Sequence, residues 1–477
     1  MRLAAFGILL VCLFVGRGVS GQSGVPELQR EIPRLMSEGE VPGLQIALIR
    51  GGKVTWIKSF GVKNAETREP VTDSTIFEAA SLSKPVFAYA VMKLVEAGRL
   101  DLDRPLQSYL SEPYIKDDDR INLITARMAL NHTTGFQNES RPGQPLKINF
   151  TPGEKFSYSG EGLLFLQRVL EKITGEKLDA FMRRTVFEPL GMTSSSYVWQ
   201  DRYEGLKASG HRIDSVPQPI RKPTVAFGYA SLQTTAGDYA KFVAALLNGV
   251  GLKKATFDEI WRTQVRVDET CVNCIGRPEG RPSESLSWGL GWGLEQTSRG
   301  RAVWHWGDNN SQYHAFVMLY PKDKTGLVVF TNSGNGHSII PEIVGRVFGN
   351  DIVHPAFAWM GYDSYKSPPL VFYRDVLARG LPAVAEYRTS RKPALSEAQV
   401  NAIGYRLLAK KRNQEAIEMF KINVEDYPKS ANVYDSLGEA FMINGDRDLA
   451  IKNLQQSLAL DPKNTHAAEL LKKLGEK

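Results

Sequence analysis

Two pairs of short apolar segments have the composition of β-strands. Residues 44–50 are mostly aliphatic, and residues 54–60 are rich in β-branched and aromatic residues. The two segments are separated by Gly51-Gly52-Lys53, which predicts a β-hairpin. Residues 315–320 and 326–331 form a second pair of the same kind. The main part of the chain therefore begins and ends with antiparallel sheet.

Three segments between these hairpins carry apolar residues at helical spacing: residues 84–97, 163–173 and 236–247. Pro85 fits the first of these only in its first turn, which places Ser81 at the start of that helix. Sheet at both ends with helices between predicts an α+β fold, in which an antiparallel β-sheet is flanked by helices.

The C-terminal part of the chain repeats with a period of 34 residues. The matching positions are Gly404 and Gly438, Ala416 and Ala450, Ile417 and Ile451, Phe420 and Leu454, and Pro428 and Pro462. This period is similar to that of tetratricopeptide repeats, so we expect two helix-turn-helix units, a small all-α domain, at residues 397–477. Two units are fewer than a solenoid usually needs. We therefore expect them to lean on the helical connector of residues 366–396 or on the larger domain.

Composition is that of a globular chain with more than one domain. The 477 residues are 42% hydrophobic and 23% charged, which excludes collagen-like and wholly disordered proteins. The net charge is +7, but from Glu397 onward 12 basic residues balance 12 acidic ones, so the excess lies upstream. No Lys/Arg-rich run with interleaved aromatic residues is present, and we expect no nucleic-acid partner.

The N-terminus has the three-part pattern of a secretory signal peptide. Arg2 precedes an apolar run at residues 3–15, and small residues offer a cleavage site before Gln22. We expect residues 1–21 to be removed and a periplasmic or extracellular protein with its main domain at residues 22–365. The alternative is an uncleaved anchor, which the short run disfavours because a span needs ~18 apolar residues.

Removal of the signal segment leaves two cysteines, Cys271 and Cys274, in a Cys-x-x-Cys pair. In an exported chain a short-loop disulfide is the first expectation. A zinc site needs a second pair of ligands that the sequence lacks, and a redox site lacks the usual strand-to-helix context. No metal site is predicted.

One short motif carries candidate chemistry, since the common signatures of hydrolases, metalloenzymes and phosphate-binding loops are absent. In Ser81-Leu82-Ser83-Lys84 the serine and the lysine are three residues apart, which places them on one face of a helix. The lysine can take the proton of the serine hydroxyl once an apolar setting lowers its pKa. The alternative is an ordinary helix start with a capping serine and a solvated lysine.

Further segments extend this motif into an ordered series. They are FEAASLSKPVFA at 77–88, ITARMALNHTTGF at 124–136, FSYSG at 156–160, ASLQTTAGDYAKF at 230–242, and HWG at 305–307 with Asn332 after the next strand. In this order the segments resemble the serine β-lactamase and penicillin-binding-protein family, in its class C and D-alanyl-D-alanine carboxypeptidase branch. The resemblance covers about residues 25–348 and implies a hydrolase without metal or cofactor.

The resemblance implies a role for each site residue. Ser81 would be the acylated nucleophile, Lys84 its proton partner, and Tyr158 the general base or a proton shuttle toward the leaving group. The backbone NH groups of Ser81 and Asp308 would form the oxyanion hole. His305 would line the site as a cation or donor.

Departures from the family pattern bear on the substrate. The usual Tyr-x-Asn motif ends here in Gly160, and Trp306 stands before Gly307 where a Thr or Ser hydroxyl usually binds a carboxylate. His305 in place of lysine resembles carboxypeptidase and esterase members. Efficient recognition of penicillins is not expected, and His132 is interpreted as loop scaffolding.

We therefore expect an exported serine hydrolase that acts on small or peptide-like ester or amide substrates through an acyl-enzyme at Ser81. One alternative is a genuine β-lactamase or D-Ala-D-Ala carboxypeptidase. Another is a non-catalytic binding protein that uses the fold and its repeats. The repeats offer a surface for a protein partner, and we expect truncation near Lys392 to leave a folded, reactive domain. The alternative is a first repeat that closes one side of the substrate cleft.

Overall fold

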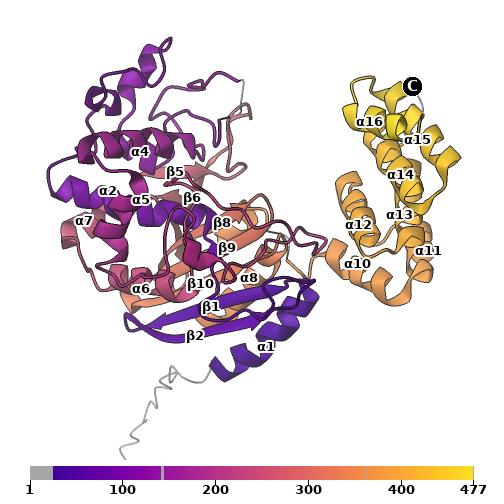
Figure 1. The fold of residues 1–477 in the computed structure, drawn as a ribbon, viewed down its shortest axis with the longest axis horizontal. Helices are drawn as coiled ribbons and strands as arrows, with labels where there is room; N and C mark the ends of the chain where they lie inside the picture. Colours follow the sequence, from indigo (N-terminus) through magenta and orange to yellow (C-terminus); the bar gives the residue numbers. More distant parts are fainter. Residues whose placement is uncertain (1–24, 141–143, 363, 476–477) are drawn as a thin grey trace, which may run out of the picture.

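An antiparallel sheet of eight strands forms the centre of the larger body in the computed structural model, which describes residues 25–140, 144–362 and 364–475. The strand order is β2-β1-β10-β9-β8-β7-β6-β5 (Figure 1). The strands are β1 (Gly43–Arg50), β2 (Lys53–Gly61), β5 (Val265–Asp268), β6 (Pro282–Trp288), β7 (Gly293–Thr297), β8 (Gly300–Asn309), β9 (Tyr313–Tyr320) and β10 (Thr325–Thr331). A separate pair consists of β3 (Phe77–Glu78) and β4 (Gln233–Thr234).

Both predicted hairpins are present, as β1 with β2 and β9 with β10. The sheet is buried on both faces because side chains alternate along each strand. In β9, Val317 belongs to the core on one face, while Phe316 and Met318 belong to the core on the other. This double burial explains why the central strands are apolar at nearly every position.

Helices cover both faces, which confirms the predicted α+β fold. The core with α2, α4 and α6 lies on one face, and the core with α1 and α8 lies on the other. The helices of this body are α1 (Val25–Glu38), α2 (Ser83–Glu96), α3 (Ala126–Leu130), α4 (Glu161–Thr174), α5 (Leu178–Met182), α6 (Ala236–Leu247), α7 (Lys254–Ile260), α8 (Ile340–Phe348) and α9 (Pro355–Trp359). Helices α2, α4 and α6 lie at the three predicted segments.

The C-terminal part is helical throughout, with cores of its own. Its helices are α10 (Pro368–Arg379), α11 (Leu381–Ser390), α12 (Glu397–Ala409), α13 (Asn413–Asp426), α14 (Ala431–Asn444), α15 (Arg447–Leu460) and α16 (Thr465–Lys473). A Cβ atom on Gly404 would lie 2.4 Å from the ring of Phe420, and one on Gly438 would lie 2.7 Å from Leu454. Each glycine thus permits the same close helix crossing, which is compatible with the predicted 34-residue repeat.

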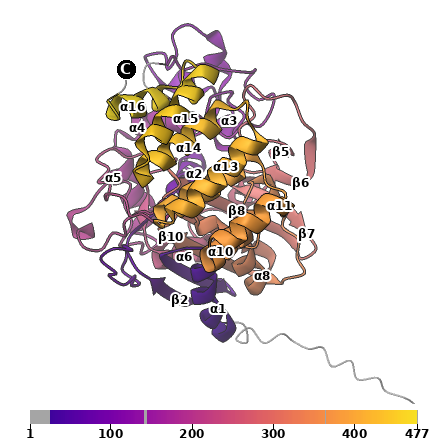
Figure 2. The ribbon, with the colours of Figure 1, turned by 90° about the vertical axis from the view of Figure 1, so that its right-hand side faces the viewer.

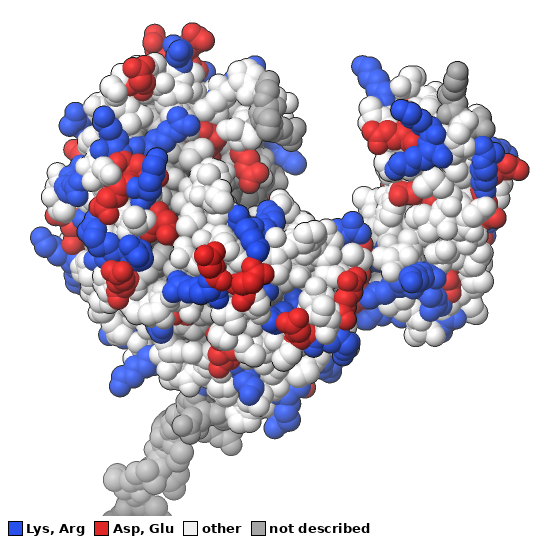
Figure 3. Space-filling view, viewed as in Figure 1, with Lys and Arg blue, Asp and Glu red and all other residues white. Residues whose placement is uncertain are grey.

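The helical part docks on the larger body through α10 and α12. Arg406 on α12 contacts Glu40 at 3.3 Å and donates to Asn335 Oδ1 at 2.8 Å, and Lys410 lies 2.8 Å from Glu40. Viewed from the side of the repeats, α10, α11 and α13 stand in front of the larger body, near the label of β8 (Figure 2). Away from the junction, a deep notch separates the two bodies (Figure 3).

The predicted signal segment, residues 1–21, lies outside the described residues. Within the described ranges, no helix is long and apolar enough to cross a bilayer.

Candidate active site

Ser81 lies in a tight turn just before α2 rather than in the helix itself. The turn spans Ala80–Leu82 and begins at Ala80, whose φ of 49° is unusual for a residue with a side chain. The Ser83 hydroxyl holds the turn closed, since it donates to the Ala80 carbonyl at 2.6 Å and accepts the Leu232 NH at 3.0 Å. Ser81 thus projects from a strained, well-supported turn.

Strand β8 runs against this turn because a glycine lies at the point of contact. A Cβ atom on Gly307 would lie 2.5 Å from the carbonyl oxygen of Ala79, a distance that only glycine avoids. The close approach brings the backbone of β8, including Asp308, to the segment that holds Ser81. This arrangement fits the expected pairing of the Ser81 and Asp308 NH groups as oxyanion donors.

Lys84 is the partner of Ser81. Its Nζ lies 2.9 Å from Ser81 Oγ and donates to the carbonyl oxygen of Tyr229 at 2.9 Å. The side chain is 1% exposed, and burial lowers the pKa of Lys84 to about 7, while the negative charge of Glu139 acts in the opposite direction. A fraction of Lys84 is therefore a neutral amine near neutral pH, which is the state that accepts a proton.

Tyr158 faces the same pair. Its ring centre lies 4.7 Å from Lys84 Nζ, and its buried hydroxyl has no hydrogen-bond partner among the described residues. Burial raises the pKa of Tyr158 well above its usual range, and the neighbouring Ser81 hydroxyl opposes part of this shift. The raised pKa keeps the Tyr158 hydroxyl protonated near neutral pH.

Two loops hold the backbone around Tyr158. On one side His132 accepts the Ser159 NH at Nδ1, at 3.1 Å, and its carbonyl accepts the Ser157 NH at 2.9 Å. On the other side the carbonyl of Val272 accepts the NH of Tyr158 itself at 3.0 Å. In this structure His132 is a buried scaffold, as its sequence context indicated.

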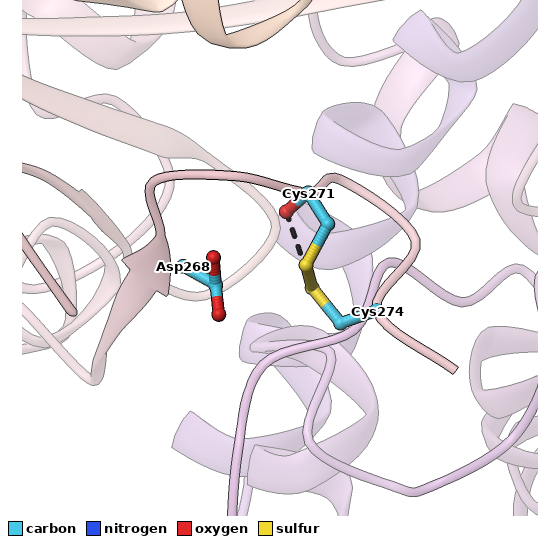
Figure 4. A group of neighbouring side chains, drawn as sticks. All are labelled: Asp268, Cys271 and Cys274. Carbon is cyan, nitrogen blue, oxygen red and sulfur yellow. Dashed lines mark hydrogen bonds between the residues drawn. A yellow bond between two sulfur atoms is a disulfide. The ribbon is translucent and has the colours of Figure 1, made fainter. Parts of the chain in front are cut away.

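The second loop is closed by a disulfide between Cys271 and Cys274 (Figure 4). The NH of Cys274 donates to the Ser157 hydroxyl at 3.0 Å, so the loop contacts the tyrosine motif twice. Asp268 lies beside the two sulfurs, and the three residues form a group with the spacing of metal ligands. The sulfurs are bonded to each other, and the two carboxylate oxygens of Asp268 accept hydrogen bonds from Thr270 and Gly280.

His305 differs from the cation or donor that its position suggested. It is fully buried, and burial together with the charge of Lys84 lowers its pKa to about 3. Its Nδ1 lies 2.7 Å from the Trp306 carbonyl oxygen, which requires a proton on Nδ1 and leaves Nε2 as a buried acceptor without a partner in the described chain. His305 is thus neutral and faces the site as an acceptor.

The structure also brings in residues that the sequence did not single out. The Tyr229 carbonyl accepts a hydrogen bond from the Lys84 amine. The exposed carboxylate of Glu139 raises the pKa of that amine through its negative charge. Asn332, by contrast, belongs to the series of motifs read from the sequence; it follows β10, is fully buried and donates to the carbonyl oxygens of Val62 and Lys63, so it supports the fold.

The larger body of the chain is similar in sequence to known proteins. The family model described as Beta-lactamase matches residues 28–339. Protein flp of Staphylococcus aureus (strain N315) is 20% identical over 352 residues, which cover 70% of this chain and 67% of that protein. Penicillin-binding protein 4 of Amycolatopsis lactamdurans is 25% identical over 348 residues, 67% of this chain and 88% of that protein.

Two solved structures share the fold. The octameric penicillin-binding protein homologue from Pyrococcus abyssi superposes with a TM-score of 0.56 at 23% identity, over 75% of this chain and 82% of that one. The D-alanine carboxypeptidase AmpC from Burkholderia cenocepacia superposes with a TM-score of 0.56 at 18% identity, over 69% of this chain and 99% of that one. The matched family region ends before α10, so the C-terminal helices are an addition to it.

Proposed function

The chain belongs to the Beta-lactamase family, and from this premise we propose that it is an exported serine hydrolase that cleaves esters or amides through an acyl-enzyme at Ser81. The observation that carries the proposal is the contact of 2.9 Å between Lys84 Nζ and Ser81 Oγ, in a setting that lowers the pKa of Lys84 to about 7. A buried amine of this kind is suited to general base catalysis near neutral pH.

In the acylation step, Ser81 Oγ attacks the substrate carbonyl carbon while the neutral amine of Lys84 accepts the serine proton. The oxyanion that forms is bound by the NH groups of Ser81 and Asp308. Tyr158 then gives its phenolic proton to the leaving group and recovers a proton from the ammonium of Lys84. Collapse of the intermediate breaks the ester or amide bond and leaves the acyl group on Ser81.

In the deacylation step, a water molecule attacks the acyl carbon and Lys84 accepts its proton. Release of the carboxylic acid returns the proton to Ser81 and restores the starting state. The complete cycle consumes one water molecule for each substrate molecule and needs no other co-substrate.

The charges around β8 disfavour substrates that are recognised by a carboxylate. His305 is neutral because burial lowers its pKa to about 3, Trp306 offers no hydroxyl, and Asp308 adds a negative charge. Cephalosporins and D-Ala-D-Ala peptides both carry a carboxylate near the scissile bond. Each missing polar contact costs about 0.5 to 1.5 kcal/mol, or several-fold in rate.

A substrate panel distinguishes this proposal from the alternative that the chain is a genuine β-lactamase or D-Ala-D-Ala carboxypeptidase, which similarity to a penicillin-binding protein and a D-alanine carboxypeptidase suggests. We expect kcat/KM for short acyl esters to exceed that for nitrocefin and for D-alanine release from an acylated D-Ala-D-Ala dipeptide. Turnover of nitrocefin at a rate equal to that of the esters would contradict the proposal.

Export is supported by the disulfide between Cys271 and Cys274, since such bonds form and persist in oxidising compartments. Sequencing the N-terminus of the protein recovered outside the cytoplasm tests this part. We expect it to begin at Gln22.

A further inference from the structure

A cavity of about 370 Å³ lies between the end of β8 and the first helix of the predicted repeats. Trp306 and Asp308 of β8 line one side, Tyr362 contributes a second aromatic surface, and Ala402 and Arg406 of α12 form the opposite wall. The volume is within the range of ligand sites, which is about 300 to 1,000 Å³. Residues of both bodies are therefore needed to form it.

Trp306 lines the cavity and also contacts the active-site residue Tyr158. Side chains alternate along β8, so Trp306 and Asp308 share one face of the strand and His305 and Gly307 share the other. The Trp306 ring lies 4.9 Å from the ring of Tyr158, the residue assigned to protonate the leaving group. One side chain thus separates the proton donor from the cavity.

The cavity lining contains one acidic side chain, Asp308, and one basic side chain, Arg406, beside the imidazoles of His314 and His337. The guanidinium of Arg406 is already paired with Glu40 and bonded to Asn335. Asp308 has no Lys or Arg partner among the described residues, and its side chain remains 44% exposed. One of its oxygens accepts the Ser311 NH at 2.7 Å and lies 3.5 Å from His314, which leaves the other free.

We propose that this cavity is a leaving-group subsite for an alcohol, thiol or amine that carries an ammonium group on an apolar body. Asp308 would face the ammonium, and Trp306 and Tyr362 would contact its alkyl groups, because cations bind favourably to aromatic faces beside a carboxylate. Helix α12 would close the outer side. The inference rests on the proposed function, since it specifies the leaving group of the same ester or amide substrate.

Three thioesters with the same acetyl group test the charge preference, with release of the thiol measured by a disulfide dye. The leaving thiols are cationic in acetylthiocholine, neutral in S-(3,3-dimethylbutyl) thioacetate and anionic in S-acetyl-3-mercaptopropionate. In the wild type we expect kcat/KM to fall in this order, with about a tenfold advantage of the cation over its neutral isostere. In Asp308→Asn this advantage is expected to shrink to less than about twofold, because asparagine keeps an oxygen for the Ser311 NH but loses the charge.

A larger side chain that fills the cavity tests whether the leaving group of the substrate occupies it. Ala402→Trp places an indole in the cavity and is expected to lower kcat/KM for acetylthiocholine at least about fivefold relative to S-methyl thioacetate. The matched control is Ala398→Trp, one turn earlier on α12 and outside the cavity lining, for which the ratio of the two substrates should remain that of the wild type.

The outcomes separate the subsite from the function on which it rests. Equal turnover of the three thioesters by the wild type, or an unchanged ratio in both Asp308→Asn and Ala402→Trp, would overturn the subsite while hydrolysis still depends on Ser81. Hydrolysis that persists at the wild-type rate in Ser81→Ala would overturn the proposed function instead. A loss of folding in Ala402→Trp, seen by circular dichroism, leaves the Asp308→Asn result to decide.

Discussion

Lys84 owes its suitability as a base to burial rather than to a second charged residue. It is 1% exposed, and its hydrogen-bond partners in the structure are the Ser81 hydroxyl and the Tyr229 carbonyl. Burial disfavours the ammonium form and lowers the pKa of Lys84 to about 7. The acylation step depends on the fraction of Lys84 that is neutral.

The rate of Ser81 acylation is therefore expected to rise with pH and to level off above about pH 7, since only the deprotonated amine accepts the serine proton. Glu139→Gln removes a negative charge that raises the pKa of Lys84, so its profile should shift toward lower pH. Stopped-flow measurement of ester acylation from pH 5 to 9 provides both profiles. A flat profile in both proteins would exclude Lys84 as the base.

Lys84→Met is expected to abolish turnover without loss of stability. A lysine whose pKa is lower in the folded state than its usual value of 10.5 destabilises the fold as pH falls from about 10.5 toward about 7, because the unfolded chain binds the proton more tightly. At pH 7 the thermal midpoint of the variant should equal that of the wild type or exceed it by about 2–4 °C. A large drop in the midpoint together with retained acylation would make Lys84 structural.

The sequence predicted Ser81, Lys84 and Tyr158 as one constellation, and the structure brings all three together. It did not predict that His305 is neutral or that the carbonyl of Tyr229 binds the amine. Charge state depends on burial by residues far away in the chain, and a backbone carbonyl has no residue-specific signature. Neither is readable from local spacing.

At the level of elements, the loop closed by Cys271 and Cys274 supplies the acceptor for the backbone NH of Tyr158. The carbonyl of Val272 is that acceptor, and the NH of Cys274 bonds to Ser157. The sequence indicated a disulfide at this position but gave no sign that it lies beside the tyrosine motif. That proximity arises from the tertiary fold.

The double variant Cys271→Ser with Cys274→Ser is expected to lower kcat several-fold while KM changes little. Without the cross-link the loop is more mobile, and the hydroxyl of Tyr158 spends less time aligned with the leaving group. Treatment of the wild type with a reductant should reproduce the loss, reoxidation should restore it, and the variant should not respond to either. A reduced wild type with full kcat would show that the loop does not position Tyr158.

Strands β5, β6 and β7 and helix α1 were not predicted. Strand β6 begins at Pro282 and is rich in serine, so its alternation of apolar residues is weak, and α1 contains Pro33, which usually ends a helix. Pairing with neighbouring strands and burial of the apolar face of α1 against the sheet override these local signals. The strongly periodic elements α2, α4 and α6 were predicted within about two residues of their ends.

At the level of the whole molecule, the C-terminal helices are more closely joined to the hydrolase than a modular arrangement suggests. Helix α12 contacts Glu40 and Asn335 and forms a wall of the cavity next to β8. Helices α10 and α11 share one hydrophobic core with α12 and α13. A cut near Lys392 would therefore expose Phe372, Val384 and Tyr387. A cut after Lys366 instead falls between the hydrophobic core of the larger body and that of the C-terminal helices.

We expect a chain truncated after Lys366 to fold and to label at Ser81 as the full chain does. A chain truncated at Lys392 should instead aggregate, because it presents the apolar face of α10 and α11 to solvent. Size-exclusion chromatography and thermal midpoints of the two proteins compare these outcomes. An unfolded product from the cut at Lys366, with a soluble one from the cut at Lys392, would assign α10 and α11 to the hydrolase body.

The central claim is that Ser81 is the nucleophile of an acyl-enzyme. Intact-mass spectrometry after treatment with a fluorophosphonate probe tests it most directly, with wild type, Ser81→Ala and Ser83→Ala compared at pH 8. We predict one adduct per chain in the wild type, located on the peptide that contains Ser81, and none in Ser81→Ala. Ser83→Ala should give a single adduct that forms more slowly, because Ser83 supports the turn. An adduct of equal yield in Ser81→Ala, or none in the folded wild type, would contradict it.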